Sequence, residues 1–310
     1  MFDKNKTIAW QNPFVVFIAA FICCLLWGSA SPAIKSGYAL FQIPADDTPS
    51  RILFAGVRFM IAGAMVIAFF SAKNRHFFHP KKTSAGYIAV LMCFQTIIQY
   101  IFFYMALAHI SGVKGSIINA AGTFFSIFLA VFIFRFEKLN IRKVLGSILG
   151  FLGVFIIVGG GSETFGHFSI AGDGAMIIAA LSSAFAGCFV KKFSSHDDPA
   201  ALSGWQFLCG GTVMMLIGLA AGGKLQPTGA SAIVLIIYMG FISAGAYTIW
   251  SILLKYNDVS RITVLGFMNP VLGVLLSALF LNEGAQAFNW LTLLALLLVS
   301  AGIGFANASS

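Results

Sequence analysis

The sequence predicts an all-α polytopic membrane protein with ten transmembrane helices, arranged as two inverted five-helix repeats, and with both termini cytoplasmic. Three observations predict this class: the composition, the length of the apolar segments and the placement of positive charge. Of the 310 residues, 59% are hydrophobic and only 9% are charged, whereas about 25% of the residues in soluble domains are charged. So few charges cannot cover the surface of a soluble protein of this size.

Ten apolar segments are each long enough to cross, as a helix, a hydrocarbon core about 30 Å thick. They do not alternate between polar and apolar residues, and they are longer than β-strands. The first segment is also longer than the core of a signal peptide, so we expect it to be retained. The predicted spans are 14–37, 50–71, 84–107, 114–134, 142–160, 172–192, 200–221, 230–254, 260–281 and 286–306.

The positive charges predict the orientation. With the N-terminus inside, most of the 19 lysines and arginines fall in connections on the inner side, and only Lys35, Arg51, Lys114 and Lys224 fall on the outer side. This asymmetry follows the positive-inside rule. The net charge of +9 therefore orients the chain in a lipid bilayer and does not predict a nucleic-acid partner. We expect a multi-pass protein of the cell (plasma or inner) membrane.

The second and seventh spans can be aligned. FAGVRFMIAG (54–63) aligns with LSGWQFLCGG (202–211), which superposes Gly56 with Gly204, Gly63 with Gly211 and Arg58 with Gln206. Because five is an odd number, the second copy must cross the membrane in the opposite direction. Inverted repeats are a recurrent plan of secondary transporters, with the substrate site near the midplane between the copies. The predicted repeats are 14–160 and 172–306, which together form one transport domain.

Several landmarks resemble a known family. They are Leu26-Trp27-Gly28-Ser29 leading to Lys35, the arginine in the second span, GSILGFLGV at 146–154, and Glu137 and Glu283 at the ends of the fourth and ninth spans. This set resembles the EamA pattern of the drug/metabolite transporter superfamily over nearly the whole chain. The resemblance implies a ten-helix, inverted-repeat transporter, usually an exporter of amino acids or other small metabolites. The ninth span has Asn269-Pro270 where the fourth has Thr123-Phe124, which leaves the substrate open.

Polar side chains in lipid must find partners or line a wet cavity. At helical spacing, such side chains share faces in four spans: Gln95 and Gln99; Ser116, Asn119, Thr123 and Ser126; Ser243, Tyr247 and Ser251 beside Trp250; and Thr263, Gly266, Asn269, Gly273 and Ser277. We expect these spans and the first to enclose a central cavity. Trp27, Tyr247 and Trp250 are candidates to stack on an apolar part of the substrate. Helix packing is the alternative interpretation for each residue.

Two prolines lie within the predicted spans, Pro32 and Pro270. A proline inside a helix lacks an N–H and clashes with the carbonyl four residues earlier, here Gly28 and Gly266. Each proline is therefore a candidate hinge, and a purely structural kink is the alternative.

Arg58 lies eight residues into its apolar run, where a charge costs at least about 2.5–3.5 kcal/mol. One interpretation is a structural arginine that binds carbonyls of a neighbouring helix or reaches the outer interface. The other is a fixed positive charge in the cavity that grips a carboxylate of the substrate. The candidate substrate-binding residues are Arg58, Gln95, Gln99, Asn119, Thr123, Gln206, Tyr247, Asn269, Trp27 and Trp250.

All ten aspartates and glutamates lie at span ends or in connections. Ion-driven transporters commonly use a carboxylate inside the membrane, so we expect a facilitator or exchanger. No catalytic or metal-binding constellation stands out at depth, so neither an enzyme nor a cofactor is predicted. A lipid-handling or structural, partner-binding membrane protein is the alternative. A homodimer is left open.

Overall fold

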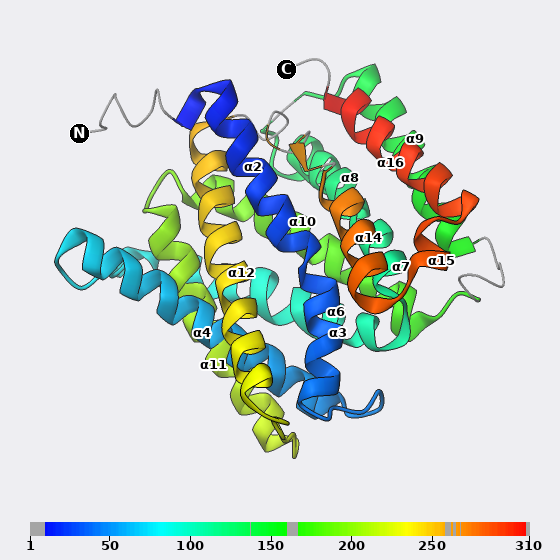
Figure 1. Cartoon of the computed structure of the whole chain (residues 1–310). Coiled ribbons are helices and arrows are strands. Elements are labelled where there is room, and N and C mark those ends of the chain that lie inside the picture. Colours follow the sequence, from blue (N-terminus) through cyan, green and yellow to red (C-terminus); the bar gives the residue numbers. More distant parts are fainter. Residues whose placement is uncertain are drawn as a thin grey trace.

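The computed structural model describes residues 10–136, 138–159, 167–257, 262, 265–266 and 268–307, and every regular element among them is a helix (Figure 1). The first half holds α2 (Pro13–Gly28), α3 (Ala30–Leu40), α4 (Thr48–Asn74), η1 (Lys82–Ser84), α5 (Ala85–Leu91), η2 (Met92–Ile98), α6 (Gln99–His109), α7 (Gly112–Asn119), α8 (Ala121–Phe128), η3 (Leu129–Ile133) and α9 (Ile141–Gly159). The second half holds η4 (Ile170–Gly174), α10 (Ala175–Phe193), α11 (Pro199–Ala220), α12 (Ala230–Tyr256), α14 (Met268–Leu281), α15 (Gly284–Ala287) and α16 (Trp290–Asn307).

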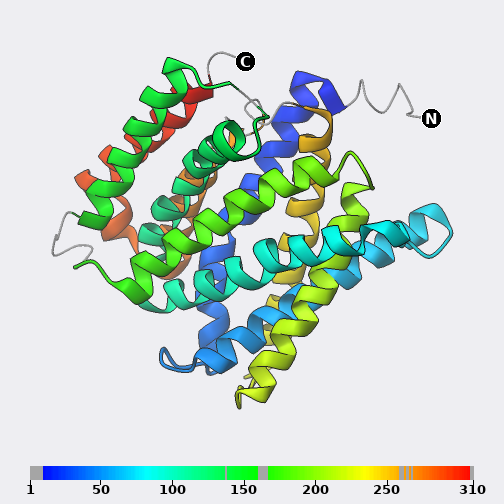
Figure 2. The same ribbon diagram turned by 180° about the vertical axis from the view of Figure 1, so that it is seen from behind.

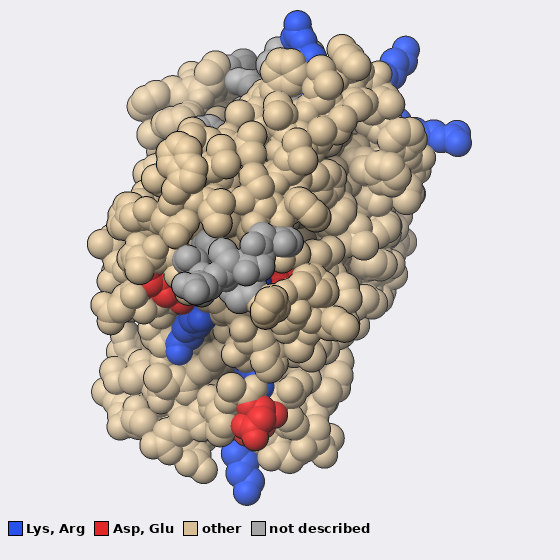
Figure 3. Space-filling view, turned by 90° about the vertical axis from the view of Figure 1, so that its right-hand side faces the viewer, with Lys and Arg blue, Asp and Glu red and all other residues tan. Residues whose placement is uncertain are grey.

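The described chain has eight helical segments that are long and apolar enough to cross a membrane, and two shorter apolar helices, Met268–Leu281 and Trp290–Phe305. Large apolar side chains such as Phe14, Phe155 and Trp290 remain 72%, 68% and 72% exposed, as expected for a surface that faces lipid. Figure 3 shows a face covered mainly by uncharged residues, with lysines and arginines at its upper edge and further charged residues of both signs in its lower half. The chain is a multi-pass helical membrane protein. Two predicted features, Glu137 and Thr263, lie outside the described residues.

Helix starts are set by capping side chains. Asn12, Asp47 and Asp198 each accept a hydrogen bond from a backbone N–H of the first helical turn, and in each case a proline occupies one of the first helical positions. Such a side chain satisfies one of the N–H groups that a helix start leaves unpaired, and proline has no N–H to satisfy. These caps explain why α2, α4 and α11 begin where they do.

The two aligned glycine segments pack against each other. A Cβ on Gly56 would lie 2.9 Å from the Gly211 carbonyl oxygen, and a Cβ on Gly63 would lie 2.6 Å from that of Gly204. The helices α4 and α11 therefore run antiparallel in close backbone contact, as small residues allow in membrane helices. The alignment of 54–63 with 202–211 replaces Gly56 by Gly204 and Gly63 by Gly211, so it converts the contact of Gly56 with Gly211 into the contact of Gly63 with Gly204.

A second antiparallel pair forms the opposite edge of the bundle, where α9 and α16 lie side by side in both views (Figures 1 and 2). A Cβ on Gly302 would lie 2.6 Å from the Gly146 carbonyl oxygen, and a Cβ on Gly153 would lie 2.7 Å from that of Ala295. The start of α2 and the end of α16 lie at the same end of the bundle.

Several spans change course near the middle of the bundle. The first is interrupted after Gly28, four residues before Pro32, and the fourth at Ala120. At the start of α14 the N–H of Asn269 donates a hydrogen bond to the Gly266 carbonyl, three residues back. The third span contains a π-helical segment, η2, a feature that is frequent at functional sites. In contrast, α4, α11 and α12 are continuous over 27, 22 and 27 residues.

Candidate functional site

A cavity of about 190 Å³ lies among these interrupted helices. Its polar and aromatic lining consists of Trp27, Ser31, Gln95, Gln99, Tyr100, Phe103, Ser116, Asn119, Thr123, Ser126, Ser183, Tyr247, Trp250, Ser251 and Asn269. The structure thus brings together every predicted substrate-binding residue except Arg58 and Gln206. Of the two predicted hinges, Pro270 lines the cavity and Pro32 does not.

An aromatic cluster forms one wall. The Trp27 ring lies 5.2 Å from that of Tyr247 and 5.0 Å from that of Trp250, both edge-on. The Tyr247 hydroxyl accepts a hydrogen bond from Gln99 Nε2 at 3.1 Å and lies 2.5 Å from the Tyr100 hydroxyl. These contacts fix the orientation of the rings, which offer a rigid, largely apolar surface with polar edges.

Two polar atoms of this wall have no hydrogen-bond partner among the described residues: the indole nitrogen of Trp27 and the amide oxygen Oε1 of Gln99. An unsatisfied buried polar group costs about 1–3 kcal/mol. A donor and an acceptor that the protein leaves unpaired beside a cavity are groups that a substrate, or a rearrangement around it, can satisfy.

Arg58 lies outside this lining. Its side chain is 0% exposed, and each guanidinium nitrogen donates one hydrogen bond: Nε to the Met239 carbonyl at 3.1 Å, and the others to Tyr104 Oη and Ser243 Oγ, both at 2.9 Å. We call these three acceptors the Arg58 cage. The guanidinium carbon also lies 5.5 Å from the centre of the Tyr100 ring. The cage is neutral, and Tyr100, whose ring lies against the guanidinium, also lines the cavity.

Gln206 is also absent from the cavity lining and is fully buried. Its amide nitrogen donates to Gln95 Oε1 at 3.1 Å, and its amide oxygen accepts from Thr96 Oγ1 at 2.5 Å. Gln206 therefore orients Gln95, which does line the cavity. Arg58 and Gln206, which the repeat alignment superposes, are therefore both absent from the cavity lining. Each contacts a residue that does line it: Tyr100 and Gln95, respectively.

The sequence interpretation missed the contribution of the sixth span. Ser183, Gly187 and Val190 of α10 line the cavity. A small-residue pattern with four-residue spacing was present in Ser183 and Gly187, and the repeat pairs the sixth span with the first, which was expected to line the cavity. Tyr100 was missed because it lies in a run of aromatic residues that gives no polar stripe.

No residue of the described lining is charged, and none is a histidine or a cysteine. Among the described residues there is also no group of three or more histidine, cysteine, aspartate or glutamate side chains that could hold a metal ion. Asp173 lies at a span end, as expected, but is fully buried, because it forms an ion pair with Lys114 at 2.8 Å. The cavity can therefore bind by hydrogen bonds and aromatic contact.

The profile of the EamA-like transporter family matches residues 15–159 and 170–308. The chain belongs to this family of transporters.

Three relatives align with most of this chain. The chain is 26% identical to a probable amino-acid metabolite efflux pump of Escherichia coli, over 88% of this chain and 89% of that protein. It is 25% identical to the uncharacterized transporter YvbV of Bacillus subtilis, over 92% of this chain and 89% of the relative. A WAT1-related chloroplastic protein of Arabidopsis thaliana is 26% identical over 83% of this chain, but the match spans only 61% of that relative.

A solved crystal structure of another protein has a TM-score of 0.64 to this chain at 18% identity, covering 94% of this chain and 96% of the other. At this identity the likeness shows a shared fold.

Proposed function

We propose that this protein exports amino acids or related small metabolites across the cell membrane by alternating access around the central cavity. The observation that carries the proposal is the cavity itself, which lies where the first and fourth spans are interrupted and where α14 begins. Interrupted helices expose backbone groups and permit bending, and transporters use them at the substrate site.

An inverted-repeat plan, which the two segments that match the same family support, is part of this proposal. The antiparallel contact of α4 with α11 pairs Gly56 with Gly211 and Gly63 with Gly204, and exchanging the repeats maps one contact onto the other. Such an arrangement allows one half to rock against the other around a fixed site. In this proposal ten spans cross the membrane, and both termini lie in the cytoplasm.

Amino acids are favoured as substrates by the wall chemistry. The Trp27 indole N–H and Gln99 Oε1 are a donor and an acceptor without partners among the described residues. They match a carboxylate and an ammonium group, while the Trp27, Tyr247 and Trp250 rings suit an apolar side chain. The relative from Escherichia coli is named for amino-acid metabolites.

Arg58 does not line the cavity, so its positive charge would attract a substrate carboxylate through the electrostatic field and not through a direct contact. Its charge has only neutral hydrogen-bond partners. The guanidinium carbon lies 5.5 Å from the centre of the Tyr100 ring, which lines the cavity, so its positive field extends to that side of the cavity. The cavity therefore favours a negative group on the side of Tyr100.

Because no carboxylate lies in the described lining, a facilitator or exchanger is the transport mode that fits best. The test is uptake of a panel of radiolabelled amino acids into proteoliposomes that contain the purified protein. We expect saturable flux of one class, reduced by Asn119→Ala. Absence of flux for every amino acid, with a folded protein, would overturn the proposal.

A further inference from the structure

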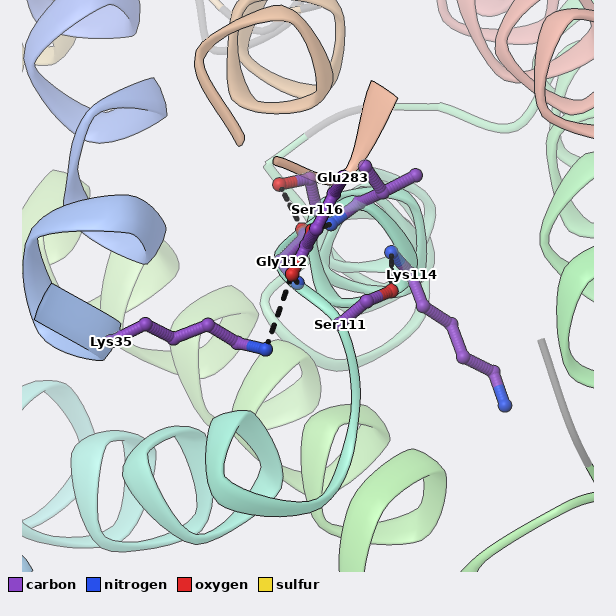
Figure 4. Close-up of polar contacts among 7 residues, drawn as sticks. Lys35, Ser111, Gly112, Lys114, Ser116 and Glu283 are labelled. Carbon is purple, nitrogen blue, oxygen red and sulfur yellow. Dashed lines mark hydrogen bonds and ion pairs between the residues drawn. The ribbon is translucent and has the colours of Figure 1, made fainter. Parts of the chain in front are cut away.

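A second cluster of polar contacts joins the middle of α3 to the start of α7 (Figure 4). The Glu283 carboxylate accepts hydrogen bonds from the backbone N–H groups of Gly112 at 3.1 Å and Val113 at 3.0 Å. The Lys35 ammonium lies 3.3 Å from the same carboxylate. One carboxylate therefore joins α3, the first turn of α7 and the segment that follows α14.

The backbone after α14 positions Glu283 beside the first turn of α7. Asn282 adopts a left-handed conformation, with φ of 57°, which turns the backbone directly after α14. A Cβ on Gly112 would lie 2.6 Å from Ser277 Oγ, so α7 and α14 touch at this point. The first N–H groups of a helix have no partner within the helix and carry partial positive charge, and a carboxylate there satisfies both.

The first turn of α7 is also tied on another side. Lys114 forms its ion pair with Asp173 of η4, with side chains only 2% and 0% exposed. Asp173 in turn accepts a hydrogen bond from the Ser169 N–H at 2.8 Å. Two acidic residues thus hold one helical turn, and both belong to the second matched segment while α7 belongs to the first.

The cluster lies just beyond one end of the cavity. The lining stops at Ser31 and Ser116, about one helical turn from Lys35 and Gly112 respectively. In the other direction it continues to Val190 and Leu254, near the ends of α10 and α12. The charge distribution assigns the Lys35 end to the outer side of the membrane.

We propose that Lys35, Glu283 and the first turn of α7 form a latch that closes the outer end of the cavity, and that transport requires it to open. This inference rests on the proposed function. Rocking the second matched segment against the first separates Glu283 from both of its partners at once, so the latch opens as a unit. The outer water that enters must then solvate the carboxylate and the ammonium group, since a buried charge left alone is costly.

The first test uses Thr123→Cys, which places a thiol in the cavity wall, in intact cells treated with a membrane-impermeant thiol reagent. Glu283→Gln keeps the shape of the side chain and removes its charge. A loss of one or two kcal/mol of latch stability corresponds to about a 5–30-fold rise in the open population. We therefore expect Thr123→Cys to be labelled about 5-fold faster or more when Glu283→Gln is added.

Matched controls accompany this test. Asp46→Asn removes an acid from the same end, where Asp46 is exposed, and should leave labelling unchanged. Ser231→Cys and Ser195→Cys place thiols at exposed positions on the predicted outer and inner sides. We expect only the first of these two to be labelled from outside. The native cysteines give the background rate in the unaltered chain.

The second test locks the latch. A Cβ on Gly112 would lie 3.2 Å from the Ser277 Cβ, close to the separation of about 3.5–4.5 Å in disulfides. In Gly112→Cys/Ser277→Cys we expect oxidation to abolish transport and a reductant to restore it, while each single variant is indifferent to oxidant.

Unchanged labelling in a folded Glu283→Gln protein, or full flux through a verified Gly112→Cys/Ser277→Cys disulfide, would overturn the latch. If Glu283→Gln does not fold, Lys35→Gln provides the same labelling comparison. Failure of the proposed function looks different: the native chain then carries no solute, whereas the labelling rates still report on the latch.

Discussion

Two parts of the bundle bury polar groups in opposite ways. Around Arg58 of the continuous helix α4, two acceptors from the continuous helix α12 and Tyr104 from α6 form a cage in which every guanidinium nitrogen donates a hydrogen bond. Around the cavity, the helices are interrupted, and Trp27 Nε1 and Gln99 Oε1 remain without partners among the described residues. The most conspicuous buried charge thus has all of its nitrogens paired within the bundle, while partly satisfied neutral groups line the cavity that we propose as the binding site.

The largest expected effect is on the rigid part. Arg58→Met leaves the Met239 carbonyl, Tyr104 Oη and Ser243 Oγ without their donor. At about 1–3 kcal/mol for each orphaned buried group, we expect the protein to lose about 3 kcal/mol or more, measured as a lower melting temperature in detergent.

Arg58→Lys is the matched control for this change. It keeps the charge but cannot reach three acceptors in the same geometry, so we expect an intermediate melting temperature. If Arg58→Met melts like the native protein and loses only transport, the comparison is wrong and Arg58 belongs to the binding surface.

The seam between α4 and α11 should be the next most sensitive. In Gly63→Val the added Cβ would lie 2.3 Å from the Leu208 backbone nitrogen. Because backbone cannot move aside cheaply, we expect a loss of about 1–3 kcal/mol in thermal unfolding. Gly86→Val adds the same side chain where no atom lies within 4 Å and should have a much smaller effect; equal effects would contradict close packing at the seam.

The cavity wall should respond more in transport than in stability. Tyr247→Phe removes the hydroxyl that meets Gln99 and Tyr100, and one lost hydrogen bond of about 1.4 kcal/mol corresponds to about a tenfold loss of flux. We expect this loss in proteoliposome uptake, with a smaller fall in melting temperature than for Arg58→Met because fewer buried groups lose a partner. Tyr87→Phe, a tyrosine outside the lining, should transport normally.

The smallest effect concerns a surface contact at the opposite end from the latch. Burial alone would raise the pKa of Asp197, but hydrogen bonds from Ser84 Oγ and the N–H groups of Lys81 and Asp198 outweigh it and hold the pKa below the usual 3.8. A lowered acid pKa stabilises the fold above about pH 4, and this stabilisation is lost as pH falls through the lowered value.

We therefore expect Asp197→Asn to cost less than about 1 kcal/mol at pH 7 and to differ less from the native protein as the pH falls below 4. Melting temperatures of both proteins between pH 3 and 7 test this. A difference that grows in acid would contradict the assigned hydrogen bonds.

Much of the architecture follows from local sequence. Long apolar segments, proline positions and capping residues such as Asp47 and Asp198 depend on near neighbours, so the helices lie close to their predicted positions. The polar stripe of Asn119 and Thr123 predicted a cavity wall for the same reason. What local sequence does not contain is depth within the bundle: Arg58 and Asn119 are both polar residues in apolar helices, and only the packing of α12 against α4 places one in a cage and the other on the wall.

Long-range contacts also explain what was not expected at the span ends. Asp173 and Glu283 appeared as terminal acids, yet the fold buries the first against Lys114 and brings the second to the start of α7. Neither partner lies near in sequence.

The proposed transport depends on the substrate occupying the central cavity, and protection from alkylation tests this most directly. With a solute that the protein transports, the rate at which a maleimide modifies purified Thr123→Cys is measured as the solute concentration rises. We predict slower modification, half-maximal near the concentration that half-saturates transport, with no effect on Ser231→Cys. Modification of Thr123→Cys at an unchanged rate in saturating transported solute would show that the substrate does not occupy the central cavity.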